Sequence, residues 1–127
     1  QDWSTHMMEH ELSGLYDVAH GAGLAVMFPA WMKYVMNHDV MRFAQFAVRV
    51  WGCEMDFQNP ENTACQGIER FEQFMTLIGM PIRFSGLGAK AEDIPVLEKT
   101  LGLGERTLGM FVKLTEEDVA KIYELAV

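Results

Sequence analysis

The feature that most restricts the fold of this chain is the spacing of its apolar residues, which recur every three or four positions in almost every segment. The two-residue period of a half-buried strand never persists for long. In a chain of 127 residues this pattern predicts a single all-α domain, a bundle-like array of about six helices. Hydrophobic residues make up 50% of the chain, which is enough to form a core.

One predicted helix, from about His20 to Met36, is apolar on nearly all sides. A helix without a polar face is typical of the centre of a bundle, so we expect this segment to be buried. Pro29 lies in its middle and lacks a backbone N–H. We therefore expect the helix to kink or break there.

The other predicted helices have recognisable ends. Gly52 follows the third, Asn59 and Pro60 open the fourth as N-cap and first helical residue, and Thr115 and Asp118 form a capping box at the last. Besides the central helix, the predicted helical segments are residues 2–12, ending near Gly14, 40–51, 60–78, a short one at 94–101, and one from 115 onward.

Charge and cysteine content exclude several classes of partner. The chain has 18 acidic and 10 basic residues, a net charge of −8, which disfavours nucleic acid. Cys53 and Cys65 form no CxxC pair, so neither a disulfide framework nor a cysteine-rich zinc site is indicated. The uncharged run from Gly21 to Met32 is too short to cross a bilayer. We expect no membrane partner and a cytoplasmic location.

All four histidines lie in the first 38 residues, at positions 6, 10, 20 and 38. His6 and His10 are four residues apart, so on a helix their imidazoles project from one face and can hold a divalent metal. With Glu9 they also match the HxxEH pattern of one class of zinc hydrolase. Surface histidines without any ligand are the simplest alternative for such a pair. His38 is expected to cap a helix or to be exposed.

The first thirty residues contain the motifs Asp2 to Ser13, Tyr16 to Ala25 and Phe28 to Ala30. These motifs resemble the metal-binding region of the iron-containing alcohol dehydrogenase family, in its butanol dehydrogenase branch. Further along the chain, Ala47 to Trp51, Ile78 to Pro81 and Ile122 to Ala126 resemble the rest of that family's C-terminal helical domain. The resemblance implies the C-terminal helical domain of that family. It also implies that His6 and His20 are two of four metal ligands. Gly21 and Gly23 would allow a neighbouring helix to approach His20 closely.

The resemblance further implies a reaction, the NAD(P)H-linked interconversion of primary alcohols and aldehydes. A divalent metal would act as a Lewis acid on the substrate oxygen. Fe²⁺ is expected first, with Zn²⁺ or Ni²⁺ as alternatives, because imidazole nitrogen suits all three. His10 corresponds to a histidine near substrate and nicotinamide, and either a proton relay or a packing role is open to it.

Two of the implied metal ligands and the implied dinucleotide-binding loop are not found among these residues. In the family, the other two metal ligands, an Asp and a His, and the Gly-rich dinucleotide loop lie earlier in the chain. The GxG triplets at 86–88 and 102–104 are turn glycines rather than such a loop. We therefore expect no cofactor-binding residue here.

The chain begins with Gln1 rather than Met, inside an amphipathic pattern. We expect residues 1–127 to be a single helical metal-binding domain, inactive alone, whose N-terminal dinucleotide-binding domain lies outside this sequence. Its partners would be that domain, a small alcohol or aldehyde, and a second subunit of a homodimer. A non-enzymatic helical module is the alternative.

Overall fold

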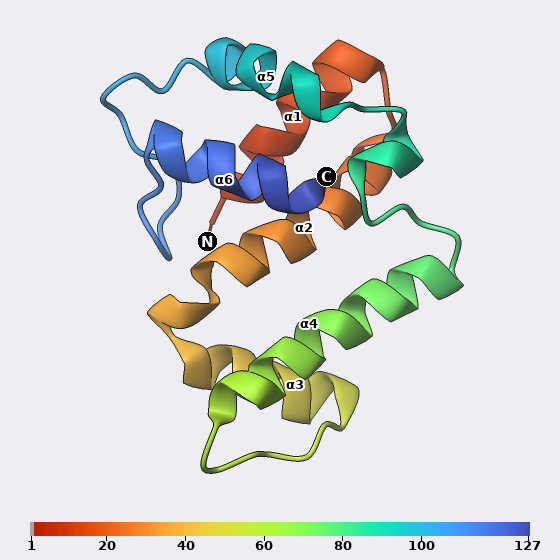
Figure 1. Cartoon of the computed structure of the whole chain (residues 1–127), viewed down its shortest axis with the longest axis vertical. Coiled ribbons are helices and arrows are strands. Elements are labelled where there is room, and N and C mark those ends of the chain that lie inside the picture. Colours follow the sequence, from red (N-terminus) through yellow and green to blue (C-terminus); the bar gives the residue numbers. More distant parts are fainter. Residues whose placement is uncertain (1) are drawn as a thin grey trace.

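The computed structural model describes residues 2–127, so Gln1, the first residue of the predicted domain, lies outside it. The described residues form six α-helices and three short 3₁₀ helices (Figure 1). The α-helices are α1 (Ser4–Tyr16), α2 (His20–Val35), α3 (Val40–Trp51), α4 (Pro60–Leu77), α5 (Ile94–Leu101) and α6 (Glu116–Ala126); the 3₁₀ helices are η1 (Met36–His38), η2 (Phe84–Leu87) and η3 (Ala91–Asp93). The all-α class and the six predicted helices are confirmed.

α2 lies at the centre of the molecule, as its apolar sequence predicted. It packs against α1, α4 and α6 (Figure 1). A kink or a break was expected at Pro29; the helix does not break there, since it is continuous from His20 to Val35. Pro29 is itself buried, and the packing of neighbouring residues on several sides offsets the one backbone hydrogen bond that proline removes.

α1 lies about two residues later in the sequence than predicted. It begins at Ser4 rather than at residue 2, and it continues through Gly14 to Tyr16, where Asp17 ends it with a left-handed φ of 52°. The Asp17 backbone N–H donates to the carbonyl of Ser13 and closes the last turn. Since α2 begins at His20, only a short connection separates the two helices, and this connection keeps them side by side.

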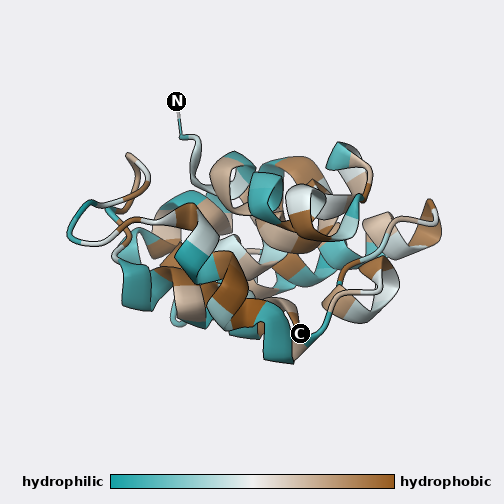
Figure 2. Ribbon diagram, turned by 90° about the horizontal axis from the view of Figure 1, so that it is seen from above, coloured by the Kyte–Doolittle hydropathy of each residue, from teal (hydrophilic) through white to brown (hydrophobic). Residues whose placement is uncertain are grey.

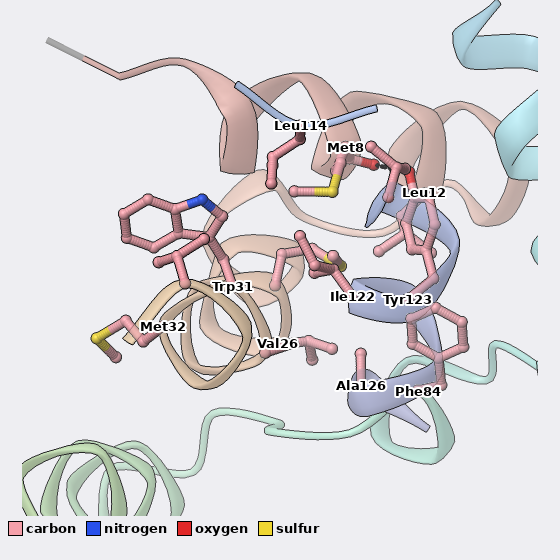
Figure 3. Packing of buried hydrophobic residues seen from close by; sticks show 14 of the residues in the cluster. Met8, Leu12, Val26, Trp31, Met32, Phe84, Leu114, Ile122, Tyr123 and Ala126 are labelled. Atoms are coloured by element: carbon pink, nitrogen blue, oxygen red, sulfur yellow. Dashed lines mark hydrogen bonds between the residues drawn. The ribbon is translucent and has the colours of Figure 1, made fainter. Parts of the chain in front are cut away.

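The main core lies between α1, α2 and α6 (Figure 3). Met8 and Leu12 of α1 meet Ile122 and Tyr123 of α6 there, and all four side chains are fully buried. The Tyr123 hydroxyl donates to the backbone carbonyl of Met8 at 2.9 Å, the bond dashed in Figure 3. In Figure 2 the ribbon changes from teal to brown within single helices, as expected of helices that bury one face.

α6 begins with the predicted capping box. The Thr115 side chain accepts from the backbone N–H of Asp118, and the Asp118 carboxylate accepts from the backbone N–H of Thr115. At α4, Pro60 takes the first helical position as predicted, but the side chain of Asn59 makes no capping bond. The Asp56 carboxylate accepts from the backbone N–H groups of Gln58 and Asn59 instead, because it lies in the loop that leads into the helix.

α3 and α4 pack against each other and run in roughly the same direction, because the loop between them leads back beside α3, and the pair lies on one side of α2 (Figure 1). Ala44 and Ala47 of α3 and Ala64 of α4 are fully buried between the two helices. Glu72 of α4 joins this pair to the rest of the molecule through ion pairs with Lys33 of α2, at 2.8 Å, and with Arg83, at 2.6 Å.

Gly88 and Gly102 each end a short helix with a positive φ, 75° and 61°. Their role as turn glycines is therefore confirmed. None of the helices in residues 2–127 is long and apolar enough to span a lipid bilayer.

Candidate metal centre

Three of the four histidines lie close together, two on α1 and one on α2. His6 and His10 project from α1, and His20 is the first residue of α2. The ring centroid of His20 lies 5.3 Å from that of His6 and 5.6 Å from that of His10. His38 is not part of this group: it is exposed in η1, with its ring edge-on to Phe111 at 5.1 Å.

The His20 ring is held from behind by Glu9. Its Nδ1 contacts Oε2 of the Glu9 carboxylate, while Oε1 of the same carboxylate accepts from the Ser13 hydroxyl. Because a carboxylate only accepts, Nδ1 carries the proton of this hydrogen bond. Nε2 of His20 is then the nitrogen left free to bind another group. The side chain of His20 is 49% exposed, whereas that of Glu9 is 0% exposed.

Sequence reasoning noted Glu9 only as part of the HxxEH pattern and missed this role. A signal was present, because Glu9 adjoins Met8 and precedes Leu12 by three residues, so it falls on the buried side of the helix. A charged residue on such a face needs a partner. The structure also disfavours the HxxEH hydrolase, since a carboxylate bonded to both His20 and Ser13 is not free to activate water.

His6 has the opposite environment. Its Nδ1 is buried and has no hydrogen-bond partner among the described residues, and the edge of Trp3 lies 5.2 Å from its ring. A buried, unpartnered ring nitrogen beside an imidazole with a free Nε2 fits a bound cation. Imidazole nitrogens are common ligands of Fe²⁺, Zn²⁺ and Ni²⁺. These residues therefore fit two positions of such a metal.

A second donor set is also present, because ligand atoms of Glu9, His10 and His20 lie within 4.8 Å of one another. Both Glu9 oxygens already take part in hydrogen bonds, and the carboxylate is fully buried. It is therefore better suited to support His20 than to bind a metal directly. His10 is exposed and borders the same space.

A cavity of about 570 Å³ opens beside His6. Its lining is mostly apolar and comes from the starts of α1 and α2 and from the segment that ends α4. The lining residues are Asp2, Thr5, His6, Gly21, Leu24, Ala25, Phe28, Phe71, Met75, Ile78 and Met80. Such a cavity, with the His6 imidazole in its wall, can take a small molecule with an alkyl chain and one polar end.

Asp2 fixes the start of α1 at the edge of this cavity. Its Oδ1 accepts from the backbone N–H and the hydroxyl of Ser4, and its Oδ2 accepts from the backbone N–H groups of Met110 and Phe111, both at 2.9 Å. Burial raises the pKa of this carboxyl, but the hydrogen bonds together lower the pKa by more than burial raises it. The net pKa therefore lies below the ordinary value. The ionised carboxylate thus ties two distant segments together.

Comparison with known proteins places this geometry in a family context. The model of the Fe-containing alcohol dehydrogenase family, C-terminal, matches residues 1–127. The NADH-dependent butanol dehydrogenase B of Clostridium acetobutylicum is 35% identical, and the match covers 99% of this chain and 33% of the relative. The NADPH-dependent aldehyde reductase YqhD of Escherichia coli is 31% identical, over 99% of this chain and 32% of that protein.

A solved structure shows the same fold. The NADH-dependent butanol dehydrogenase A of Thermotoga maritima superimposes with a TM-score of 0.91 at 37% identity, over 99% of this chain and 33% of that chain. The present chain thus spans about a third of the length of the relatives that it matches.

Proposed function

This chain belongs to the Fe-containing alcohol dehydrogenase family, and we propose that it is the metal-holding helical part of an NAD(P)H-dependent enzyme that interconverts primary alcohols and aldehydes. The observation that carries the proposal is the pairing of His6 and His20 from two helices, with the buried Nδ1 of His6 left without a hydrogen-bond partner in the described part of the chain. The names of the matched relatives, a butanol dehydrogenase and an aldehyde reductase, support this substrate class.

His6 and His20 would supply two of the metal ligands, and the remaining ligands would come from the part of the enzyme outside this chain. A bound divalent metal would supply Lewis acidity at the substrate oxygen. Fe²⁺ is our first assignment, in keeping with the family, and Zn²⁺ or Ni²⁺ remain alternatives.

Residues of this chain would transfer the proton and bind the alkyl chain of the substrate. We infer that His10 would take a proton from the substrate hydroxyl or return one to it, and its 5.6 Å ring distance from His20 supports this role. The apolar cavity beside His6 would hold the alkyl chain of a small alcohol or aldehyde. NAD(P)H would bind to an N-terminal domain outside residues 1–127. A homodimer and a cytoplasmic location remain predictions.

The direct test is a metal and activity assay of the full-length protein and its His6→Ala and His20→Ala variants. Purified wild-type protein should contain a stoichiometric transition metal and should oxidise NADH or NADPH with butanal. Both variants should lose metal and activity together, because each loses one ligand. His38→Ala is the control, since His38 is exposed outside the cluster. A His20→Ala variant with full metal content and turnover would contradict the ligand assignment.

His10→Ala separates the proton relay from the ligands. It should retain metal while turnover falls roughly 10²- to 10⁴-fold, the usual effect of a lost general acid or base. Unchanged turnover would leave His10 with a packing role. A wild-type protein without metal or dehydrogenase activity would favour a non-enzymatic helical module.

A further inference from the structure

We propose that Glu9 is a positioning residue, which fixes the tautomer and orientation of His20 so that Nε2 faces the metal. This assignment rests on the proposed function, because it requires that His20 be a metal ligand.

The first observation is the burial of the Glu9 carboxylate. A fully buried carboxylate is costly unless its oxygens are bonded to polar partners. Ser13 donates to Oε1 and His20 donates to Oε2, so both oxygens are engaged. Ser13 is one helical turn after Glu9 and holds the carboxylate in the direction of α2. The carboxylate contacts His20 there.

The second observation is the space that α2 leaves for Glu9. Gly23 faces the carboxylate one turn after His20, and a Cβ at this position would lie 2.8 Å from Glu9 Cδ and closer to Oε1. Any residue other than glycine would displace the side chain that holds His20. The sequence of α2 therefore accommodates the carboxylate of α1, and the fit between the two helices depends on it.

The consequence for His20 follows from its exposure. Its side chain is 49% exposed, so packing alone would leave the ring free to rotate and to exchange its two neutral tautomers. With Nδ1–H donating to Glu9, only Nε2 keeps a lone pair for a metal, and the negative charge makes that nitrogen a stronger donor. Among residues 2–127, no side chain or backbone group plays the same part for Nδ1 of His6. The two ligands are thus positioned by different means.

The main test compares the metal affinity of full-length wild-type protein with that of Glu9→Gln. Gln has the same shape and can still accept from Nδ1–H, but it lacks the charge. We expect the dissociation constant for Zn²⁺, measured by competition with a chelator, to rise about 10- to 100-fold. Glu11→Gln, the same change two residues along α1, should leave it unchanged. An unchanged constant in Glu9→Gln would overturn the proposal, and a rise above about 1,000-fold would make Glu9 a ligand instead.

A second measurement detects the tautomer without any metal. In metal-free protein labelled with ¹⁵N-histidine, NMR should show His20 with the proton on Nδ1 in the wild type and in Glu9→Gln. Glu9→Ala should show a mixture of tautomers, because no acceptor remains. A residue with a purely structural role would not change this ratio, so equal spectra in wild type and Glu9→Ala would also overturn the proposal.

The third variant moves the carboxylate and keeps its charge. Gly23→Ala should weaken Zn²⁺ binding as Glu9→Gln does, whereas Gly21→Ala should not, because a Cβ there meets only Met80 Cε at 3.8 Å. Equal effects on Zn²⁺ affinity from the two glycine variants would count against the proposal. A wild-type protein that binds no metal contradicts the proposed function, whereas wild-type binding that Glu9→Gln leaves unchanged contradicts the role of Glu9 alone.

Discussion

Gly23 of α2 and Gly67 of α4 each face another helix at a point where a methyl group does not fit. At Gly67 a Cβ would lie 2.6 Å from the Cβ and 2.9 Å from the Cα of Ala47 on α3. At Gly23 it would overlap the carboxylate of Glu9 on α1. The same local feature therefore makes room for a helix backbone in one region and for a buried charge in the other.

The different neighbours of Gly67 and Gly23 indicate different roles for the two helix pairs. The α3–α4 pair is packed through small apolar residues, with Ala44, Ala47 and Ala64 fully buried, so its glycine serves stability. The α1–α2 pair encloses a carboxylate and brings three histidines together, so its glycine would serve the geometry of the proposed metal site. Substitutions in the first pair should change the free energy of unfolding, and those in the second should change metal binding.

Gly67→Val should have the largest effect on stability. Its side chain would overlap both the backbone and the side chain of Ala47, and neither can move without separating the helices. We expect a loss of about 3 kcal/mol in the free energy of unfolding, measured by urea denaturation. Gly14→Ala is the control, because its Cβ meets nothing within 4 Å and should raise stability slightly. Similar unfolding midpoints for the two variants would refute the close approach at Gly67.

Glu72→Ala tests how the two regions are joined. The Glu72 side chain is only 10% exposed and binds Lys33 of α2 through Oε1 and Arg83 through Oε2. Removing it should cost about 2 kcal/mol, as expected for charged hydrogen bonds whose partners are partly exposed. The variant should be compared in urea with Glu69→Ala, an exposed change on the same helix that should shift stability by less than about 0.5 kcal/mol. Equal effects would mean that apolar contacts alone join the regions.

The features that the sequence predicted correctly are those determined by local chemistry. The bounds of α3, from Val40 to Trp51, follow from apolar spacing, and the capping box of Thr115 and Asp118 follows from adjacent residues. The end of α1 was misplaced because Gly14, which has open space around it, is compatible with a helix as well as with its end. Nothing local distinguishes the two cases.

The site was predicted only in part, for a related reason. His6, His10 and His20 could be selected from spacing and from resemblance, and the structure brings their rings together. Their functional roles remain predictions. The contact between Glu9 and His20 depends on how two helices cross, and that crossing depends on Gly23. Periodicity places Glu9 on a buried face without identifying its partner.

Thr63→Val asks whether a buried polar group in the α3–α4 region affects structure alone. The Thr63 hydroxyl, which is buried, accepts from the Asp56 N–H at 2.8 Å and donates to the Glu54 carbonyl at 3.2 Å. Valine keeps the shape and leaves both groups unpaired, so we expect a loss of about 1 kcal/mol in urea. The affinity for Zn²⁺ should not change. A weakened affinity would show that the two regions are coupled, and it would contradict the separation of stability in α3–α4 from metal binding in α1–α2.

Asp2→Asn should have the smallest effect, and that effect should depend on pH. Burial raises the pKa of Asp2, but hydrogen bonds from Ser4, Phe111 and Met110 lower it to a net value below the ordinary 3.8. A carboxyl whose folded pKa is depressed stabilises the protein fully above its unfolded pKa, and this contribution is lost as the pH falls through the folded pKa. At pH 7 the variant should therefore lose about 0.5 kcal/mol, because the carboxylate is partly exposed and screened by solvent. Thermal unfolding of the two proteins should converge as the pH falls below 3.8 and through the depressed pKa of Asp2 in the folded protein. Glu105→Gln, an exposed change in the turn after α5, should match the wild type throughout. A constant difference between Asp2→Asn and wild type at all pH values would mean that shape rather than charge ties α1 to Met110 and Phe111. The start of α1 would then be held by the shape of its side chains, as the α3–α4 pair is, and not by a charge of the kind that Glu9 carries.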